Sequence, residues 1–208
     1  MKKKICLLIA LACTVVSVFA QMDSASKLPG WQFNAAASFY FIPKDFFVLP
    51  VFSADKNKLH LEARYNYEDR ETFSGWIGYN FEGGNKLEYA ITPMIGGVVG
   101  LSDGIAPGVE TTLSFKDFEF YSESEYFFDF KSSENFFLYT WTDLSYSPKE
   151  WLWFGISGQR TRLYKTDLDI QRGLLIGAGL KSWELSTYGY NLFGSDDPFL
   201  LITLSKEF

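Results

Sequence analysis

The sequence has very few residues that carry thiol or imidazole chemistry. Among its 208 residues are two cysteines, Cys6 and Cys13, and one histidine, His60. Both cysteines lie in a segment that we expect to be cut off, so the mature chain is predicted to have no disulfide and no thiolate metal site. A hydrolase triad or a histidine metal site would have to use His60. A lone histidine on a polar strand face is usually an ordinary polar residue, so we predict no metal, no cofactor and no enzymatic activity.

Long apolar runs are also missing after residue 20. The longest uncharged run there, 28–43, is shorter than the roughly 20 residues of a membrane-spanning helix, and it contains Pro29 and Gly30. The next run, 89–102, is broken by Pro93 and three glycines. The sequence therefore predicts no transmembrane helix in this part of the chain.

An excess of basic residues is missing as well. The chain has 19 Lys and Arg against 25 Asp and Glu, a net charge of −6. Nucleic-acid phosphates are bound mainly through Lys and Arg, so a chain this acidic is not expected to bind nucleic acid.

The N-terminal segment has the parts of a secretory signal peptide. Lysines at 2–4 precede a mostly apolar stretch at 5–19, and Val18-Phe19-Ala20 provides small or β-branched residues for cleavage. We predict a cut before Gln21, a signal peptide at 1–20 and one mature domain at 21–208, whose net charge is −9 because three lysines are lost. A lipoprotein signal cut before Cys13 fits less well, because the apolar run continues past that cysteine.

The C-terminal stretch 198–208 has the alternation of a strand with two different faces. Leu200, Ile202 and Leu204 alternate with more polar positions such as Thr203. A terminal Phe after such a strand resembles the closing strand of bacterial outer-membrane β-barrels, which the barrel assembly machinery reads. Lys206 departs from that pattern, which usually has an apolar or aromatic residue there.

Strand-like segments recur at short spacing along the mature chain, with no helical period. Aromatic residues, 19% of the chain, cluster at the segment ends like the girdles of a lipid-facing barrel. We predict strands at 31–42, 46–54, 58–68, 71–82, 86–99, 105–116, 118–130, 135–147, 150–162, 172–182, 183–193 and 198–208.

The connections between these segments fall into two classes. Tight turns such as Lys116-Asp117 and Lys181-Ser182 alternate with connections that are mostly longer, such as 164–171. Short turns on one rim and longer loops on the other are typical of an outer-membrane barrel, whose short turns are periplasmic. We predict an all-β, single-domain antiparallel transmembrane β-barrel of twelve strands, with ten as the alternative count.

Three stretches carry a resemblance to a known family. The segments at 59–69, 104–108 and 169–173 resemble an uncharacterised family of bacterial exported β-rich proteins, over most of the mature chain. The family implies no assigned activity, so the resemblance supports fold and export only.

Charged residues gather on one face of the predicted strands. On the third strand Leu59, Leu61, Ala63, Tyr65 and Tyr67 share the apolar face, and His60 shares the other face with several charged residues. We read the polar face as the lumen, with further inward residues at Asp129, Asp143, Trp153 and Glu184. The candidate lumen or binding residues are Glu62, Arg64, Glu88, Glu110, Tyr121, Glu123, Glu125, Tyr139 and Trp141.

An acidic lumen predicts a narrow porin-like channel, or a binding barrel, for small polar or cationic solutes. The alternative is a structural or interaction barrel whose lumen is plugged by ion pairs and hydrogen bonds. A less favoured alternative is an outer-membrane lipid-modifying hydrolase. About eight strands leave a lumen filled by side chains and about 16–18 leave an aqueous channel, so twelve strands leave both main readings open.

Four basic residues, Arg160, Arg162, Lys165 and Arg172, flank or lie in the longest outer loop. Guanidinium groups bind phosphates well, which predicts contact with lipopolysaccharide. The alternative is a solvated charge cluster paired with Asp167 and Asp169. The expected partners are outer-membrane lipid, lipopolysaccharide and the barrel assembly machinery.

Overall fold

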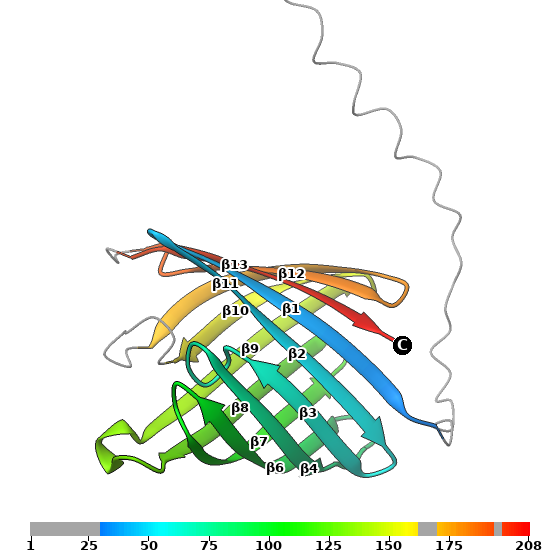
Figure 1. Ribbon diagram of the computed structural model, residues 1–208. Helices are drawn as coiled ribbons and strands as arrows, with labels where there is room; N and C mark the ends of the chain where they lie inside the picture. Colours follow the sequence, from blue (N-terminus) through cyan, green and yellow to red (C-terminus); the bar gives the residue numbers. More distant parts are fainter. Residues whose placement is uncertain (1–29, 162–169, 194–196) are drawn as a thin grey trace, which may run out of the picture.

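The computed structural model describes residues 30–161, 170–193 and 197–208. They form a closed antiparallel β-barrel (Figure 1). Its elements are β1 (Gln32–Ile42), β2 (Asp45–Lys56), β3 (Leu59–Tyr65), β4 (Thr72–Tyr79), β5 (Phe81–Gly84), β6 (Glu88–Gly100), β7 (Gly104–Phe115), β8 (Phe118–Asp129), the 3₁₀ helix η1 (Ser133–Asn135), β9 (Phe137–Lys149), β10 (Leu152–Arg160), β11 (Gln171–Leu180), β12 (Trp183–Tyr190) and β13 (Phe199–Glu207).

The barrel has twelve strands, because β4 and β5 are two segments of one strand. Both pair with β6 in a single register, with Gly78 opposite Met94 and Phe81 opposite Ile91. In that register the unpaired positions Tyr79 and Asn80 lie opposite Pro93 and Thr92, and Pro93 has no N–H to give to the ladder. The first strand pairs with the last, β1 with β13, so no sheet edge is left and a sandwich is excluded. The predicted fold and strand count are confirmed.

The two rims of the barrel differ as the turn pattern predicts. On one rim, the short-turn rim, the connections are 57–58, 85–87, 116–117, 150–151 and 181–182. On the other, the long-loop rim, they are 43–44, 66–71, 101–103, 130–136, 161–170 and 191–198. The turn at 43–44 is the exception to the length rule, and β1 begins and β13 ends on the short-turn rim.

Apolar side chains cover the outside of the barrel. Exposed side chains include Phe73 and Ile77 on β4 and Ile95 and Val99 on β6. All of the remaining strands also carry exposed large apolar residues. A continuous apolar outer surface is what lipid requires of a transmembrane barrel. On β13, Thr203 faces inward and its hydroxyl lies 2.8 Å from that of Ser38. Among the residues that the structure describes, no helix is long and apolar enough to cross a membrane.

The predicted face of Tyr67 is wrong. Asn66 has φ 58°, a left-handed conformation that ends β3 and breaks the alternation of faces. Its amide holds the turn in place, donating to Val48 O at 2.9 Å and accepting from Glu71 N at 2.8 Å. The chain therefore folds back over the lumen, and Tyr67 points inward rather than to lipid.

Three lumen-facing glycines lie beneath aromatic side chains of the residues directly opposite them. The pairs are Trp76 with Gly96, Trp153 with Gly177 and Tyr190 with Gly173. A Cβ atom added at Gly96 would lie 2.4 Å from the Trp76 ring, and one added at Gly177 would lie 2.2 Å from that of Trp153. Glycine weakens a strand by leaving a gap, and a cross-strand aromatic fills that gap.

The hydrophobic core lies inside the barrel, toward the long-loop rim. It consists of two clusters, and Tyr67 and Trp141 pack against both. One cluster is Tyr40, Phe47, Leu49, Tyr190, Phe199 and Leu201, and the other is Trp76, Met94, Val98, Ala106, Phe127, Phe137 and Tyr139.

Candidate functional site

The lumen is divided into two regions of different character. Toward the long-loop rim, the two hydrophobic clusters and the residues around Arg64 fill it, and we call this region the packed half. Toward the short-turn rim it contains a cavity of about 650 Å³, which we call the acidic cavity. Tyr67 is the one cavity-lining side chain from a described loop of the long-loop rim, whereas Glu150 comes from a turn of the short-turn rim.

Arg64 is the centre of the packed half and is only 2% exposed. Its Nη1 lies 2.6 Å from Glu123 Oε1 and 3.3 Å from Glu125 Oε2 on β8. Its Nη2 lies 2.5 Å from Glu62 Oε2 and 3.6 Å from Glu110 Oε1. One guanidinium therefore joins β3 to β7 and β8 across the lumen and faces four carboxylates, which its planar fork of donors suits.

Two aromatic rings lie against the Arg64 guanidinium. Its carbon lies 4.3 Å from the centre of the Tyr67 ring and 4.6 Å from that of Trp76. The Tyr67 hydroxyl donates to Glu123 and receives a hydrogen bond from Tyr139 at 3.1 Å. These contacts fix the arginine in one geometry, as cation–π contacts and shared hydrogen bonds do in a desolvated site.

The charged groups that line the acidic cavity are mainly of one sign. Of the described residues that line it, seven are carboxylates and one, Arg64, is basic. The lining carboxylates are Glu62, Glu110, Glu119, Glu123, Asp143, Glu150 and Glu184. Serines, aromatic rings and aliphatic side chains complete the wall, among them Ser38, Ser145, Ser147, Ser186, Tyr121, Trp141, Trp153, Tyr188 and Leu175. A concave wall with this excess of negative charge attracts cations.

Most candidate residues from the sequence come together here. Seven of the nine line the cavity, namely Glu62, Arg64, Glu110, Tyr121, Glu123, Tyr139 and Trp141. Glu125 is fully buried beside Arg64, outside the cavity lining. Glu88 has the inward parity but starts β6 at the short-turn rim, where it is exposed and outside the cavity lining.

Three further inward candidates, Asp143, Trp153 and Glu184, line the cavity, and Asp129 does not. Asp129 ends β8 and accepts hydrogen bonds from the backbone N–H groups of Lys131 and Ser132, at 2.6 and 3.0 Å. Its role is to order the long loop that follows, because its carboxylate is used by that loop's backbone.

Two cavity residues with clear charge, Glu119 and Glu150, are absent from the sequence-based candidates. Glu119 could have been found, because it continues the alternation of Tyr121 and Glu123 by one step toward the rim. Glu150 lies in a turn, where alternation gives no signal. Tyr67 was hidden by the left-handed turn at Asn66.

The basic cluster is described only in part, because Arg162 and Lys165 lie outside the described residues. Arg160 ends β10, and its Nη1 donates to Leu138 O at 2.6 Å. Arg172 is exposed near the start of β11, at the same long-loop rim.

Several solved outer-membrane proteins have a similar fold. The KdgM porin in complex with disordered oligogalacturonate matches with a TM-score of 0.60 at 12% identity, over 85% of this chain and 99% of that one. The KdgM porin alone gives the same TM-score and coverage at 13% identity. The Acinetobacter baumannii outer membrane protein Omp33 matches with a TM-score of 0.49 at 12% identity, over 86% of this chain and 98% of that one.

At the sequence level the comparisons give no relative. No protein-family model matches the chain, and no curated protein matches it. The structural likeness is at low identity and concerns the fold alone, which is that of a porin-like outer-membrane β-barrel.

Proposed function

We propose that this outer-membrane barrel binds small cationic solutes in its acidic cavity and passes them through a narrow, cation-preferring lumen. The observation that carries the proposal is the cavity wall, where seven carboxylates stand against one arginine. Like charges in a narrow, poorly solvated space are weakly screened, so the wall repels anions and concentrates cations.

The negative charge of the cavity wall also argues against the ligand of the structurally similar KdgM porin as a ligand of this barrel. The KdgM porin was solved with oligogalacturonate, which is a polyanion. The acidic cavity has the wrong charge for such a ligand, so the proposed solutes are cations, and the shared fold is used for a different class of solute.

The packed half sets the condition for passage. Arg64 and its carboxylate partners lie across the lumen between β3 and β8, so ions must pass through a layer of packed side chains. We therefore propose small conductance, with the acidic cavity as a vestibule on the periplasmic side. Export through a signal peptide at 1–20, insertion by the barrel assembly machinery and contact of Arg160 and Arg172 with lipopolysaccharide belong to the same proposal.

The experiment is a reversal-potential measurement in planar bilayers across a salt gradient. The expected result is cation preference that decreases when Glu119 and Glu184 are both changed to Gln, because both carboxylates line the cavity. A matched control is Glu88→Gln, which removes an exposed carboxylate outside the cavity lining and should leave the reversal potential unchanged. Anion preference would overturn the proposal.

A second candidate function, a structural barrel with a plugged lumen, is favoured by the Arg64 network. Four carboxylates and two aromatic rings around one guanidinium form a cross-brace of the kind expected in a permanently closed lumen. A correctly folded barrel that carries no current, even after Arg64→Met, would favour this second function. A lipid hydrolase is not supported, since His60 contacts the carboxylates of Asp55 and Glu62 rather than a hydroxyl nucleophile.

A further inference from the structure

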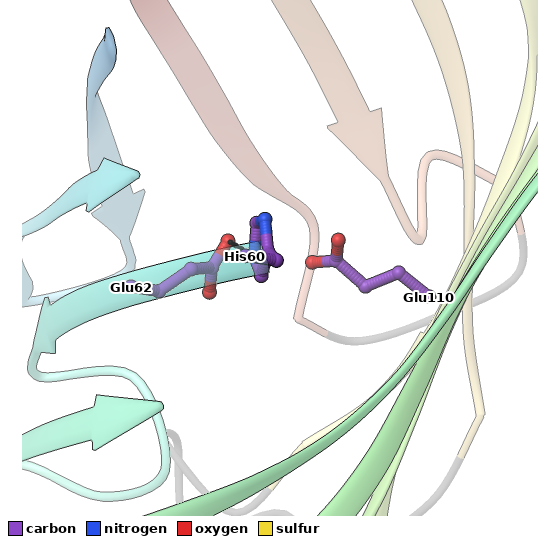
Figure 2. Close-up of side chains that lie close together, drawn as sticks. All are labelled: His60, Glu62 and Glu110. Carbon is purple, nitrogen blue, oxygen red and sulfur yellow. Dashed lines mark ion pairs between the residues drawn. The ribbon is translucent and has the colours of Figure 1, made fainter. Parts of the chain in front are cut away.

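One side chain in the lumen wall is held as a metal ligand would be. His60 is 6% exposed, and its Nε2 is buried without a hydrogen-bond partner. The carboxylate of Glu62 lies beside it, with Oε1 at 3.2 Å from Nε2. Figure 2 shows Glu110 extending from β7 toward the same point, from the opposite side of the ring. A buried nitrogen that faces carboxylates without a well-formed hydrogen bond is a position that a cation can fill.

We propose that His60, Glu62 and Glu110 bind one divalent transition-metal cation on the wall of the acidic cavity. Their nearest ligand atoms, one from each residue, all lie within 4.8 Å of one another. One imidazole nitrogen and two carboxylate oxygens are ligands that Zn²⁺ accepts, leaving a fourth position for water. Ligand atoms on a tetrahedral zinc lie roughly 3.3–3.6 Å apart, so a rotation of the flexible Glu110 side chain would close the site.

The other ring nitrogen of His60 is already fixed. Its Nδ1 lies 2.9 Å from Asp55 Oδ1, and the same oxygen receives a hydrogen bond from Asn80 Nδ2 at 2.7 Å. Asn80 in turn accepts from the Thr92 hydroxyl at 2.7 Å. A carboxylate that holds Nδ1–H leaves the Nε2 lone pair directed at the metal, which is the common arrangement behind a metal-binding histidine.

The charge around the site favours a cation as well. Arg64 binds Glu62 through Oε2, which leaves Oε1 directed at His60. The single positive charge of Arg64 faces four carboxylates, so the group as a whole keeps an excess of negative charge. A divalent cation beside Glu62 and Glu110 offsets that excess.

This inference deepens the proposed function and rests on it, because the ion would reach the site through the acidic cavity. Both carboxylate ligands line that cavity. The solute is then a divalent transition-metal ion, which binds at His60, Glu62 and Glu110 on its way through the lumen.

The test is equilibrium binding of Zn²⁺ to the untagged, folded barrel in detergent, by competition with a chromophoric chelator. Folding of each variant is checked by heat-modifiable migration in gels. Wild type should bind one Zn²⁺. Asp55→Asn should weaken binding by about 10–100-fold, the range found for groups that orient a metal ligand, and Glu110→Gln, which removes a ligand, should weaken it at least as much. The matched control, Glu184→Gln, removes the same charge from the same cavity and should change the affinity less than about threefold.

A spectroscopic readout separates ligation from general attraction. His60 is the only histidine in the chain, so imidazole nitrogen coupling in the electron paramagnetic resonance of bound Cu²⁺ can come from this residue alone. The coupling should disappear in His60→Gln.

The unfavourable outcomes are distinct. If folded wild type binds no Zn²⁺, the site is overturned and His60 is an ion-pair partner of Asp55 and Glu62. If Glu110→Gln and Glu184→Gln weaken binding equally, the cavity attracts cations diffusely, which overturns the site and leaves the proposed function standing. Specific binding in a barrel without cation current would support the site and overturn the channel.

Discussion

The packed half and the acidic cavity contain the same kinds of side chain but use them differently. In the packed half, Glu123 and Glu125 each contact one guanidinium, and aromatic rings cover the assembly. In the cavity, Glu119, Glu150 and Glu184 face open space and are not held by a basic partner among the described residues. The carboxylates paired with Arg64 connect strands across the lumen and stabilise the barrel. The carboxylates without a basic partner make the electrostatic potential of the cavity negative, so one lumen combines a structural region and a recognition region.

The largest expected effect comes from removing the brace. Arg64→Met should lower the free energy of unfolding by about 3–5 kcal/mol, because buried carboxylates are left without their counter-charge. Urea unfolding in lipid vesicles measures this. The triple variant that also carries Glu123→Gln and Glu125→Gln should recover much of the loss, since the uncompensated charge is then gone.

A control for this prediction lies on the outside of the barrel. Arg172→Met changes an exposed arginine near the long-loop rim and should alter the free energy of unfolding by less than about 0.5 kcal/mol. If Arg64→Met and Arg172→Met lowered the free energy of unfolding equally, the buried network around Arg64 would not stabilise the barrel.

The next largest loss of stability is expected from a substitution in the barrel wall, which surrounds both the packed half and the acidic cavity. Ile202→Arg places a cation on the lipid face of β13 and should cost about 2–4 kcal/mol if that position is near the bilayer midplane. Thr203→Arg, one residue along, points into the cavity and should cost less, because carboxylates and water receive the cation there. Equal costs in a vesicle unfolding titration would contradict the assignment of faces.

Substitutions at two glycines compare how tightly side chains are packed in the packed half and in the acidic cavity. Gly96→Ala should cost about 1–3 kcal/mol, because the new methyl group meets Trp76, which is 3% exposed and has nowhere to move. Gly177→Ala creates a similar clash with Trp153, but that ring lines the cavity and can shift into it, so the cost should be smaller.

The outward-facing neighbour of Gly96 serves as the control for both. A Cβ added at Gly97 meets no atom within 4 Å, so Gly97→Ala should be close to neutral in the same unfolding assay. If Gly177→Ala proves as costly as Gly96→Ala, the cavity is not soft enough to accept a displaced ring.

Much of the wall could be predicted from the sequence, because a strand has a period of two. The alternation at Ile202 and Thr203 gives the correct faces, and the turn chemistry at Lys116 and Lys181 gives the correct rims. The period fails only where the backbone leaves the strand conformation, as at Asn66, whose left-handed φ sends Tyr67 inward.

What the sequence could not give is the height of each inward side chain and its partner across the lumen. Arg64 and Glu123 are 59 residues apart, and their contact depends on strand tilt and stagger, which alternation does not determine. An acidic strand face therefore indicates inward carboxylates, but it could not say that Glu125 is paired and buried while Glu184 lines the cavity. The meeting of Glu110 with His60 was hidden for the same reason.

The smallest expected effect lies outside both halves, in the long loops. Asp103 and Lys131 join two loops, with Nζ and Oδ2 2.5 Å apart, and Phe130 N donates to Asp103 O at 2.8 Å. The hydrogen bond from Lys131 holds the pKa of Asp103 below its ordinary value and raises the pKa of Lys131.

Because the pKa of Asp103 is lower in the folded loop, its contribution is present above the ordinary carboxyl pKa and is lost as pH falls through the folded value. Hydrogen exchange of the Phe130 amide should therefore be slightly faster in Asp103→Asn than in wild type at neutral pH, and equal in the two proteins once Asp103 is protonated. The pair is exposed and screened by salt, so global unfolding should hardly change. A difference in exchange that persists at low pH would show that the loops are held by the backbone contact and that the ion pair contributes nothing.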